Sequence, residues 1–357
     1  MPFVQRPRRV TQFLSCLAVL AVVLTAACQS TEEPTGPVGT PRVSAEPTAA
    51  PSSGSSGDSS GSPSASQSSA KPVDKSDNLD NITVTGEKLK EPKVELKKKP
   101  WAIDKTRVKV LEEGKGATVP ETGPVEVHYY GVNGRTGEKF DDSFSRGQTA
   151  TFALDQVVPG FQKGLAGQKA GSRIIVAMPG EDGYDSSGGS PQAGIEVGDT
   201  LIFVIDVVST VLDGPDGEKQ ELADDLPQVS DDTDDPKITV PKSDPPTELK
   251  VAPVIKGSGA EVSETDSVMV NYRGVLWADG KVIDENYGDK SQPETATPSE
   301  LIPGFGEGLV KQTVGSRVLI VIPPDKAYGP EGNEEMKVPA DATLVYVVDI
   351  LFIQPAQ

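Results

Sequence analysis

Hydrophobic residues recur along this chain mainly with the two-residue period of β-strands. Val125, Val127 and Tyr129 alternate with polar neighbours, and short apolar runs follow at 174–178 and 201–208. A second set of runs covers 268–272, 318–322 and 344–352, with Gly, Pro and Asp clusters in between. Such alternation is typical of strands bounded by turns. The pattern predicts a mainly antiparallel sheet, formed twice.

One short stretch in each half favours a helix. It follows Pro159 in the first half and Pro303 in the second, because the fixed φ of proline suits a first helical position. Gly164 and Gly167 limit the first of these helices to a turn or two. A sheet with one small helix on a face defines an α+β domain whose core lies between them.

The two halves are also similar residue by residue, at a spacing of about 143 residues. Tyr129, Gly131, Pro159, Gly160, Phe161, Arg173, Tyr184 and Asp206 recur as Tyr272, Gly274, Pro303, Gly304, Phe305, Arg317, Tyr328 and Asp349. Two copies of this length are duplicated domains and not a stack of small repeats. We predict domains at 88–212 and 236–357. The similarity reaches upstream to Pro92 and Pro236, which predicts a short strand ahead of each core.

The segment 213–235 between the copies holds ten acidic residues and one lysine, Lys219. Such a charge block favours extension and solvation, so we expect an interdomain linker. A calcium loop is the alternative for Asp231–Asp235. It is disfavoured because Pro236 and Lys242 stand where that loop needs Gly and Glu.

The N-terminal residues predict export. Arg6, Arg8 and Arg9 precede an apolar stretch at 13–24, which is too short to span a bilayer. Small residues then lead into Cys28. A basic start, a short apolar middle and a small-residue exit are typical of a secretory signal.

The position of Cys28 resembles the cleavage site of bacterial lipoproteins. We therefore expect removal of residues 1–27, lipidation of Cys28 and anchoring to the outer face of the bacterial cell membrane. The following residues up to 80 are mostly rich in Ser, Pro, Gly and Thr, which predicts a disordered tether over 28–80. The alternative is an ordinary secretory signal with an incidental cysteine.

Composition narrows the chemistry. The net charge of -19 disfavours binding to nucleic acid. His128 is the only histidine, and Cys16 lies in the segment expected to be removed. Histidine-based nucleophilic catalysis and multi-histidine metal sites are therefore excluded, and we expect no cofactor and no metal. Asn271 replaces His128 in the second copy, which favours a local strand role for that histidine.

Each copy contains a series of short motifs in a fixed order. In the first copy they are VHYYG at 127–131, KFDDS at 139–143 and VVPGF at 157–161. In the second copy they are VNYRG at 270–274, LIPGF at 301–305 and AYG at 327–329. In order and spacing these motifs resemble the FKBP family of peptidyl-prolyl isomerases. The resemblance implies two domains with an apolar, aromatic-lined cup that holds proline.

The matching positions identify the site residues that the resemblance implies. The first cup would use Tyr129, Phe140, Asp141, Val157, Val158, Phe161, Tyr184, Ile195 and Phe203. The second would use Tyr272, Asp284, Leu301, Ile302, Phe305, Tyr328, Val338 and Tyr346. The alternative for these aromatic residues is an ordinary core.

Three departures from the family pattern bear on activity. Asp185 follows Tyr184 where the family has Gly, and Ile283 stands where the family has Phe. We also expect no aromatic residue near Ala150 or Ala296. These differences predict proline binding in both copies and fuller catalysis in the first.

The predicted function is rotation of X-Pro bonds in unfolded or extended exported polypeptides, by a monomer whose membrane contact is its lipid anchor. The alternative is a non-catalytic module that binds proline-rich segments or acts as a chaperone. A solute-binding lipoprotein is disfavoured because the chain lacks an alternating βα pattern.

Overall fold

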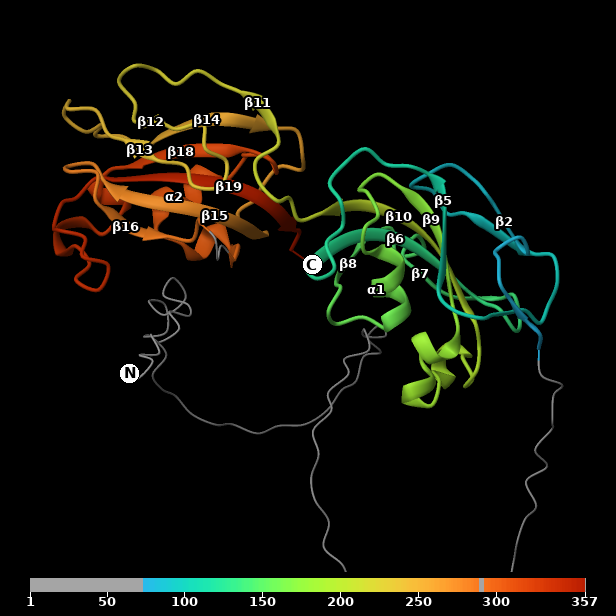
Figure 1. Cartoon of the computed structure of the whole chain (residues 1–357). Coiled ribbons are helices and arrows are strands. Elements are labelled where there is room, and N and C mark those ends of the chain that lie inside the picture. The colour runs from blue at the N-terminus through green and yellow to red at the C-terminus, as the bar shows by residue number, and fades with distance from the viewer. Residues whose placement is uncertain (1–72, 289–291, 357) are drawn as a thin grey trace, which may run out of the picture. The chain divides into compact units, whose positions relative to one another are not determined.

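The computed structural model describes residues 73–288 and 292–356 (Figure 1). The predicted signal segment, Cys28 and the tether up to residue 72 lie outside these residues. Within the described ranges, no helix has both the length and the apolar character needed to cross a membrane.

The first domain contains a six-stranded antiparallel main sheet, two separate two-stranded sheets and one short α-helix. Its strands are β1 (Lys75–Ser76), β2 (Ile82–Thr85), β3 (Lys93–Leu96), β4 (Ala102–Ile103), β5 (Arg107–Glu112), β6 (Pro124–Asn133), β7 (Lys139–Asp142), β8 (Ala150–Ala153), β9 (Arg173–Met178) and β10 (Leu201–Thr210). The main sheet has the order β5-β9-β10-β6-β7, and β8 pairs with the first half of β6. Helix α1 spans Pro159–Leu165, and three 3₁₀ turns, η2 (Gly180–Asp182), η3 (Asp185–Ser187) and η4 (Pro191–Ala193), precede β10.

The main sheet of the second domain repeats that of the first with one added strand. The strands of this domain are β11 (Gly217–Lys219), β12 (Gln228–Val229), β13 (Ile238–Thr239), β14 (Lys250–Gly257), β15 (Ser267–Leu276), β16 (Val282–Glu285), β17 (Glu294–Ala296), β18 (Arg317–Ile322) and β19 (Leu344–Gln354). Helix α2 spans Pro303–Leu309, with 3₁₀ turns η5 (Pro298–Glu300), η6 (Pro324–Lys326) and η7 (Gly329–Glu331). The sheet order is β11-β14-β18-β19-β15-β16, and β17 pairs with β15. The predicted α+β class and tandem arrangement are confirmed.

Each helix lies close against a central strand because glycine faces the sheet. A Cβ atom at Gly164 of α1 would come within 2.6 Å of Val176 Cγ1 on β9. One at Gly308 of α2 would come within 2.7 Å of Ile320 Cδ1 on β18. These glycines lower the helix propensity of both segments. They also let each helix approach its sheet closely, which forms the core between helix and sheet.

The sheet of the first domain is covered on both faces. All six residues of β9 are buried, and its alternate side chains enter two different clusters. Ile174, Val176 and Met178 pack on the helix side, whereas Ile175 and Ala177 pack on the opposite side. A strand that reads as a continuous apolar run is typical of a sheet covered on both faces.

The β2–β3 hairpin and the segments on either side of it supply the second cover. Leu79, Ile82, Trp101 and Ile103 are buried there against β9, β10 and β6. The prediction of one core between sheet and helix was incomplete, and the predicted tether was wrong over 73–80. Leu79 is buried, and β1 pairs with β4.

A buried ion pair holds this hairpin to the sheet. The Arg173 guanidinium binds both carboxylate oxygens of Asp206, at 2.6 and 2.7 Å, and both side chains are almost fully buried. Its remaining N–H groups donate to the backbone carbonyls of Gly86 and Lys90, at 3.0 and 2.9 Å. The Leu89 N–H donates to Asp206 at 2.8 Å. The pair thereby joins β9, β10 and the turn of the hairpin.

The second domain uses the same device. Arg317 binds Asp349 at 2.7 and 2.8 Å and donates to the carbonyls of Asp232 and Thr233. The acidic run is therefore held by its backbone carbonyls against an arginine. Its carboxylates also take part, since Asp235 pairs with Arg273.

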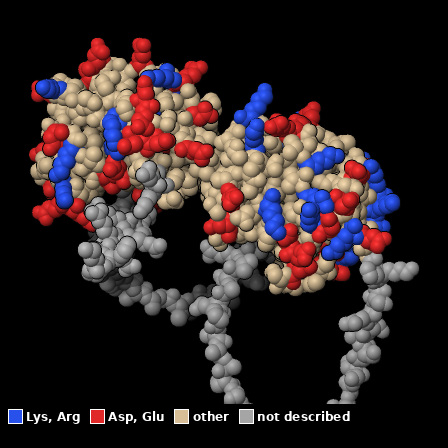
Figure 2. Space-filling view, viewed as in Figure 1, with Lys and Arg blue, Asp and Glu red and all other residues tan. Residues whose placement is uncertain are grey.

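The prediction that 213–235 is a linker between the domains was therefore wrong, whereas its acidic side chains are mostly exposed, as expected. Strand β11 pairs with β14. Leu222, Leu226 and Val229 pack against a buried cluster of the second domain that includes Trp277 and Leu319. These three apolar residues are spaced among the acids, so burial of one side leaves the carboxylates outside. Figure 2 shows acidic side chains spread over the visible faces of both domains, with Lys and Arg between them.

Removing the charge of Asp206 tests the role of the buried ion pair. Asp206→Asn leaves the Arg173 charge buried without its counter-ion, so we expect the unfolding free energy of the first domain to fall by about 3–5 kcal/mol. The chain has two tryptophans, Trp101 and Trp277. Urea unfolding in a Trp277→Phe background reports the first domain through Trp101 fluorescence. The exposed Asp155→Asn serves as control, and a loss under about 1 kcal/mol in Asp206→Asn would contradict the assigned role.

Candidate active site

Three buried aromatic rings form the floor of the first candidate site. Tyr129 from β6, Phe161 from α1 and Phe203 from β10 are each less than a tenth exposed. The Phe161 and Phe203 rings stand edge to face, with centroids 4.8 Å apart, and Tyr129 lies 6.5 and 6.3 Å from them. Edge-to-face pairs of this kind stabilise a fixed ring arrangement.

Half-buried residues surround this floor. Phe140 from β7 meets Phe203 edge to face at 5.5 Å. Val157 and Val158, which lead into α1, and Tyr184, ahead of η3, pack against the same cluster, as does buried Ile195. The structure therefore gathers all the predicted apolar residues of the first site in one place, which we call the first aromatic cluster.

Two residues at or beside this cluster were missed from the sequence. Phe152 on β8 meets Phe161 at 5.4 Å and Tyr129 at 5.8 Å, so the expectation of no aromatic residue near Ala150 was wrong. Arg146, in the loop after β7, was not considered. The alternation on β8 could have indicated Phe152, because it lies two residues from Ala150 on the same side of the strand. No spacing in the sequence identifies Arg146.

The polar end of the first cluster is a three-membered network. The Tyr129 hydroxyl donates to Asp141 Oδ2 at 2.5 Å and accepts from Arg146 Nη2 at 2.7 Å. Arg146 Nη1 also binds Asp141 at 2.9 Å. Burial and the Asp141 carboxylate raise the pKa of Tyr129 above its ordinary value. Burial likewise raises the pKa of Tyr184, so both hydroxyls stay protonated and able to donate near neutral pH.

His128 lies outside this network. Its Nδ1 is 3.0 Å from the Ser143 hydroxyl, and its ring stacks on Phe144 with centroids 4.7 Å apart. These contacts agree with the predicted local role on strand β6.

The second domain forms an equivalent set, the second aromatic cluster. Tyr272, Phe305 and Tyr346 replace Tyr129, Phe161 and Phe203, and the Phe305 and Tyr346 rings stand edge to face at 4.8 Å. Tyr272 lies 6.3 Å from each of these two rings. The remaining predicted residues are Leu301, Ile302 and Tyr328, which are half-buried, and Val338, which is buried.

A pair of substitutions changes one wall of the second cluster. In the first domain the Phe140 ring fills the space over Gly131, where a Cβ would come within 2.7 Å of it. In the second domain Ile283 replaces that phenylalanine. The Tyr346 ring occupies the space over Gly274 instead. The aromatic wall expected to be missing is thus partly restored from β19.

This exchange leaves a buried hydroxyl. Tyr346 is fully buried, and its hydroxyl has no hydrogen-bond partner among the described residues. The Tyr328 hydroxyl is engaged, since it lies 2.9 Å from the sulfur of Met336. A buried donor without a partner costs free energy, so the second cluster is less well satisfied than the first.

The polar end of the second cluster also differs. The Tyr272 hydroxyl lies 3.0 Å from Asp284 and 3.3 Å from Glu294 on β17. Burial, followed by the nearby carboxylates, raises the pKa of Tyr272. The predicted contact between Tyr272 and Asp284 is present, whereas Glu294 was missed.

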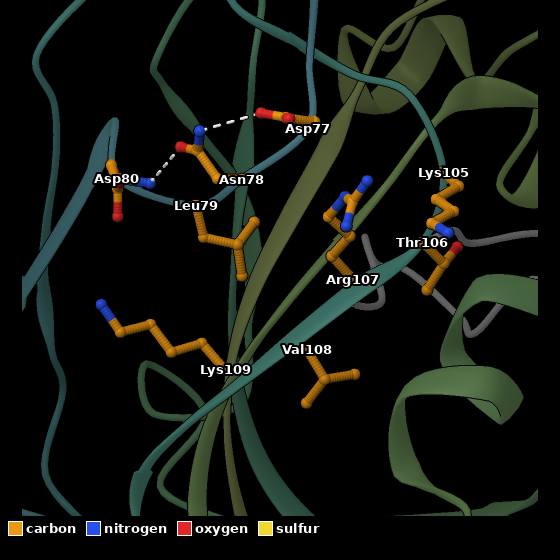
Figure 3. A pocket seen from close by; sticks show the side chains of 9 residues that line it. All are labelled: Asp77, Asn78, Leu79, Asp80, Lys105, Thr106, Arg107, Val108 and Lys109. Atoms are coloured by element: carbon orange, nitrogen blue, oxygen red, sulfur yellow. Dashed lines mark hydrogen bonds between the residues drawn. The ribbon is translucent and has the colours of Figure 1, made fainter.

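A separate open depression of about 480 Å³ lies beside the edge strand β5 (Figure 3). It is lined by Asp77, Asn78, Leu79, Asp80 and the five residues 105–109. Asn78 links its two acidic neighbours, bonding the Asp77 carboxylate and the Asp80 N–H at 3.0 Å each. None of the residues of the first aromatic cluster lines it, and its mixed charge contrasts with the apolar clusters.

The chain thus has two α+β domains in tandem, each with an aromatic cluster between its helix and its sheet. The profile of the FKBP-type peptidyl-prolyl cis-trans isomerase family matches residues 116–208 and 259–351, just over half of the chain. The chain therefore belongs to this family, which confirms the resemblance and the predicted enzyme class.

Curated relatives match one or both domains. A probable FK506-binding protein of Corynebacterium glutamicum is 39% identical over 122 residues, covering 34% of this chain and 99% of the relative. The isomerase FkpA of Escherichia coli is 38% identical over 100 residues, 28% of this chain and 36% of FkpA. FK506-binding protein 59 of Drosophila melanogaster is 30% identical over 253 residues, 68% of this chain and 49% of that protein.

Solved structures give similar matches. The crystal structure of FkpA from Escherichia coli is 37% identical and covers 31% of this chain and 50% of that chain, with a TM-score of 0.29. The three FKBP domains of wheat FKBP73 are 19% identical and cover 70% of this chain and 94% of that chain, also with a TM-score of 0.29.

Removing the hydroxyl of Tyr346 tests the exchanged wall. Tyr346→Phe deletes a buried donor without a partner, so we expect the second domain to gain about 1 kcal/mol of unfolding free energy. Trp277 fluorescence in a Trp101→Phe background reports this domain. The matched change Phe203→Tyr adds a hydroxyl where Phe140 already fills the space, and we expect it to destabilise the first domain by about 1–3 kcal/mol. If Tyr346→Phe destabilises the second domain, or if Phe203→Tyr stabilises the first, the proposed exchange of the wall is wrong.

Proposed function

We propose that the protein isomerises X-Pro bonds in exported polypeptides, with the proline ring held at the aromatic clusters. The observation that carries this proposal is the first cluster, in which buried rings from β6, α1 and β10 adjoin half-buried Val157, Val158 and Tyr184. An apolar floor with a few polar groups at its edge is typical of sites for small apolar groups.

The chemistry needs no nucleophile. Rotation about the X-Pro bond is slowed by a barrier of about 18–20 kcal/mol, because amide resonance must be broken. The planar amide is more charge-separated than the twisted one, so an apolar site favours the twisted state. The Tyr184 hydroxyl donates to a substrate carbonyl, while the Asp141 carboxylate keeps Tyr129 oriented through their hydrogen bond.

The two domains are expected to differ in turnover. In the first cluster, the Tyr184 hydroxyl is proposed to donate to the substrate. In the second, the equivalent Tyr328 hydroxyl already lies at hydrogen-bond distance from the Met336 sulfur. This observation favours a second candidate function for the second domain alone, in which it binds proline segments with little catalysis.

A matched pair of variants tests this assignment. In the full chain, Tyr184→Phe is expected to slow cis-to-trans conversion of a Leu-Pro peptide about tenfold, the effect of losing one hydrogen bond of about 1.4 kcal/mol in the transition state. Tyr328→Phe is expected to change the rate less than twofold. A wild-type chain that leaves the uncatalysed rate unchanged while binding the peptide would overturn catalysis and support the binding module.

We propose further that the mature protein is held at the outer face of a bacterial cell membrane by lipid on Cys28. The support is the order of basic, apolar and small residues over 6–27 immediately before this cysteine. Two acyl chains are sufficient for stable anchoring, whereas the acidic chain offers little attraction to anionic headgroups. Such a location would place the isomerase where newly exported chains fold.

Cys28→Ser tests the anchor. In a bacterial host that processes lipoproteins, we expect labelled palmitate on the wild-type protein and none on the variant, which moves from the membrane to the soluble fraction. Cys16→Ser is the control, because that residue lies in the segment expected to be removed. Equal labelling of wild type and Cys28→Ser would exclude lipidation at this cysteine.

A further inference from the structure

Each aromatic cluster has a tyrosine bonded to an aspartate, and a second charged residue of opposite sign joins this pair in the two domains. In the first, Arg146 Nη2 lies 2.7 Å from the Tyr129 hydroxyl. In the second, Glu294 Oε2 lies 3.3 Å from the Tyr272 hydroxyl. The polar end therefore gains a cation in one domain and an anion in the other.

The position of Glu294 follows from strand register. Strand β17 places Glu294 opposite Val270 of β15, just as β8 places Ala150 opposite Val127 of β6. The same ladder position thus bears a methyl group in the first domain and a carboxylate in the second. Because side-chain direction alternates along a strand, this register aims Glu294 toward the cluster.

Without a ligand, the surroundings of Glu294 disfavour the ionised form of its carboxyl group. Burial, and then the Asp284 carboxylate, raise the pKa of Glu294, and the Tyr272 hydroxyl only partly opposes this. A carboxyl group whose pKa is raised on folding contributes stability at low pH and loses it as the pH rises through the folded value. Ionised Glu294 therefore weakens the domain at neutral pH, and a cation from a ligand would offset that cost.

We propose that Glu294 makes the second aromatic cluster selective for proline segments that carry Lys or Arg beside the proline. This inference rests on the proposed function, since it presumes that both clusters hold proline. A basic side chain next to a proline at the cluster reaches the carboxylate of Glu294, an exposed residue of β17. In the first domain the same side chain meets the Arg146 guanidinium, which disfavours it.

The experiment compares three peptides, with Lys-Pro, Glu-Pro or Leu-Pro at the centre, by NMR titration of the isotope-labelled full chain. Amide signals report the two clusters separately in one sample. We expect the second cluster to bind the Lys-Pro peptide about fivefold or more tightly relative to Glu-Pro, the effect of one charge pair at a partly exposed site. Glu294→Gln should lower this ratio at least threefold, and added salt should lower it in wild type.

Two further variants complete the test. Glu248→Gln removes the same charge from an exposed position just ahead of β14, a strand that lies toward the opposite edge of the sheet. It should leave the ratio of Lys-Pro to Glu-Pro affinity unchanged. Ala150→Glu should shift the first cluster toward Lys-Pro, independently of any effect of Glu294→Gln on folding.

The outcomes separate the two proposals. If Leu-Pro binds the second cluster but neither Glu294→Gln nor Ala150→Glu changes the Lys-Pro to Glu-Pro ratio, the selectivity role of Glu294 is wrong and proline binding stands. If no peptide shifts the signals of either cluster, the proposed function fails and the selectivity fails with it.

Discussion

The buried arginine–aspartate pair is the interaction on which each domain depends. Taking two charges out of water is costly, and the cost is offset only where the remaining donors find partners. In the first domain Arg173 meets that condition by binding Asp206 and two carbonyls of the β2–β3 turn. Since Asp206 and Phe203 belong to the same strand, the pair on one face of the sheet holds in place the strand that carries the aromatic floor on the other.

The same constraint explains the acidic segment before the second domain. Arg317 needs carbonyl partners as Arg173 does, and the backbone of Asp232 and Thr233 provides them. Net charge alone favours solvation of this segment. Backbone carbonyls and three spaced apolar residues nevertheless attach it to the sheet, because local pairing of buried groups outweighs screened repulsion between exposed carboxylates.

Duplication has kept the scaffold while the two sites have diverged. Ile283 and Tyr346 exchange the origin of one wall, and Glu294 takes the ladder position of Ala150. Both domains share the helix glycines that face the sheet, the tyrosine bonded to an aspartate and the edge-to-face pair of rings. What differs is the polar edge, where Arg146 in one domain and Glu294 in the other set the local charge. This divergence of the polar edge is compatible with one fold because Arg146 and Glu294 lie beside the buried rings and not among them.

The sequence by itself determined the strands, the short helices, the duplication and most of the aromatic residues, since these depend on period, on proline and glycine, and on motifs repeated twice. Tertiary structure alone decided three other features. The sheet face opposite α1 is covered by Leu79, Ile82 and Trp101. These residues follow no regular hydrophobic spacing that a segment of this length would reveal. Arg146 and Glu294 act through distances set by a loop and by strand register, and neither can be read from local spacing. Packing decides which residues far apart in the sequence come into contact, because contact energies depend on distance in space and not along the chain.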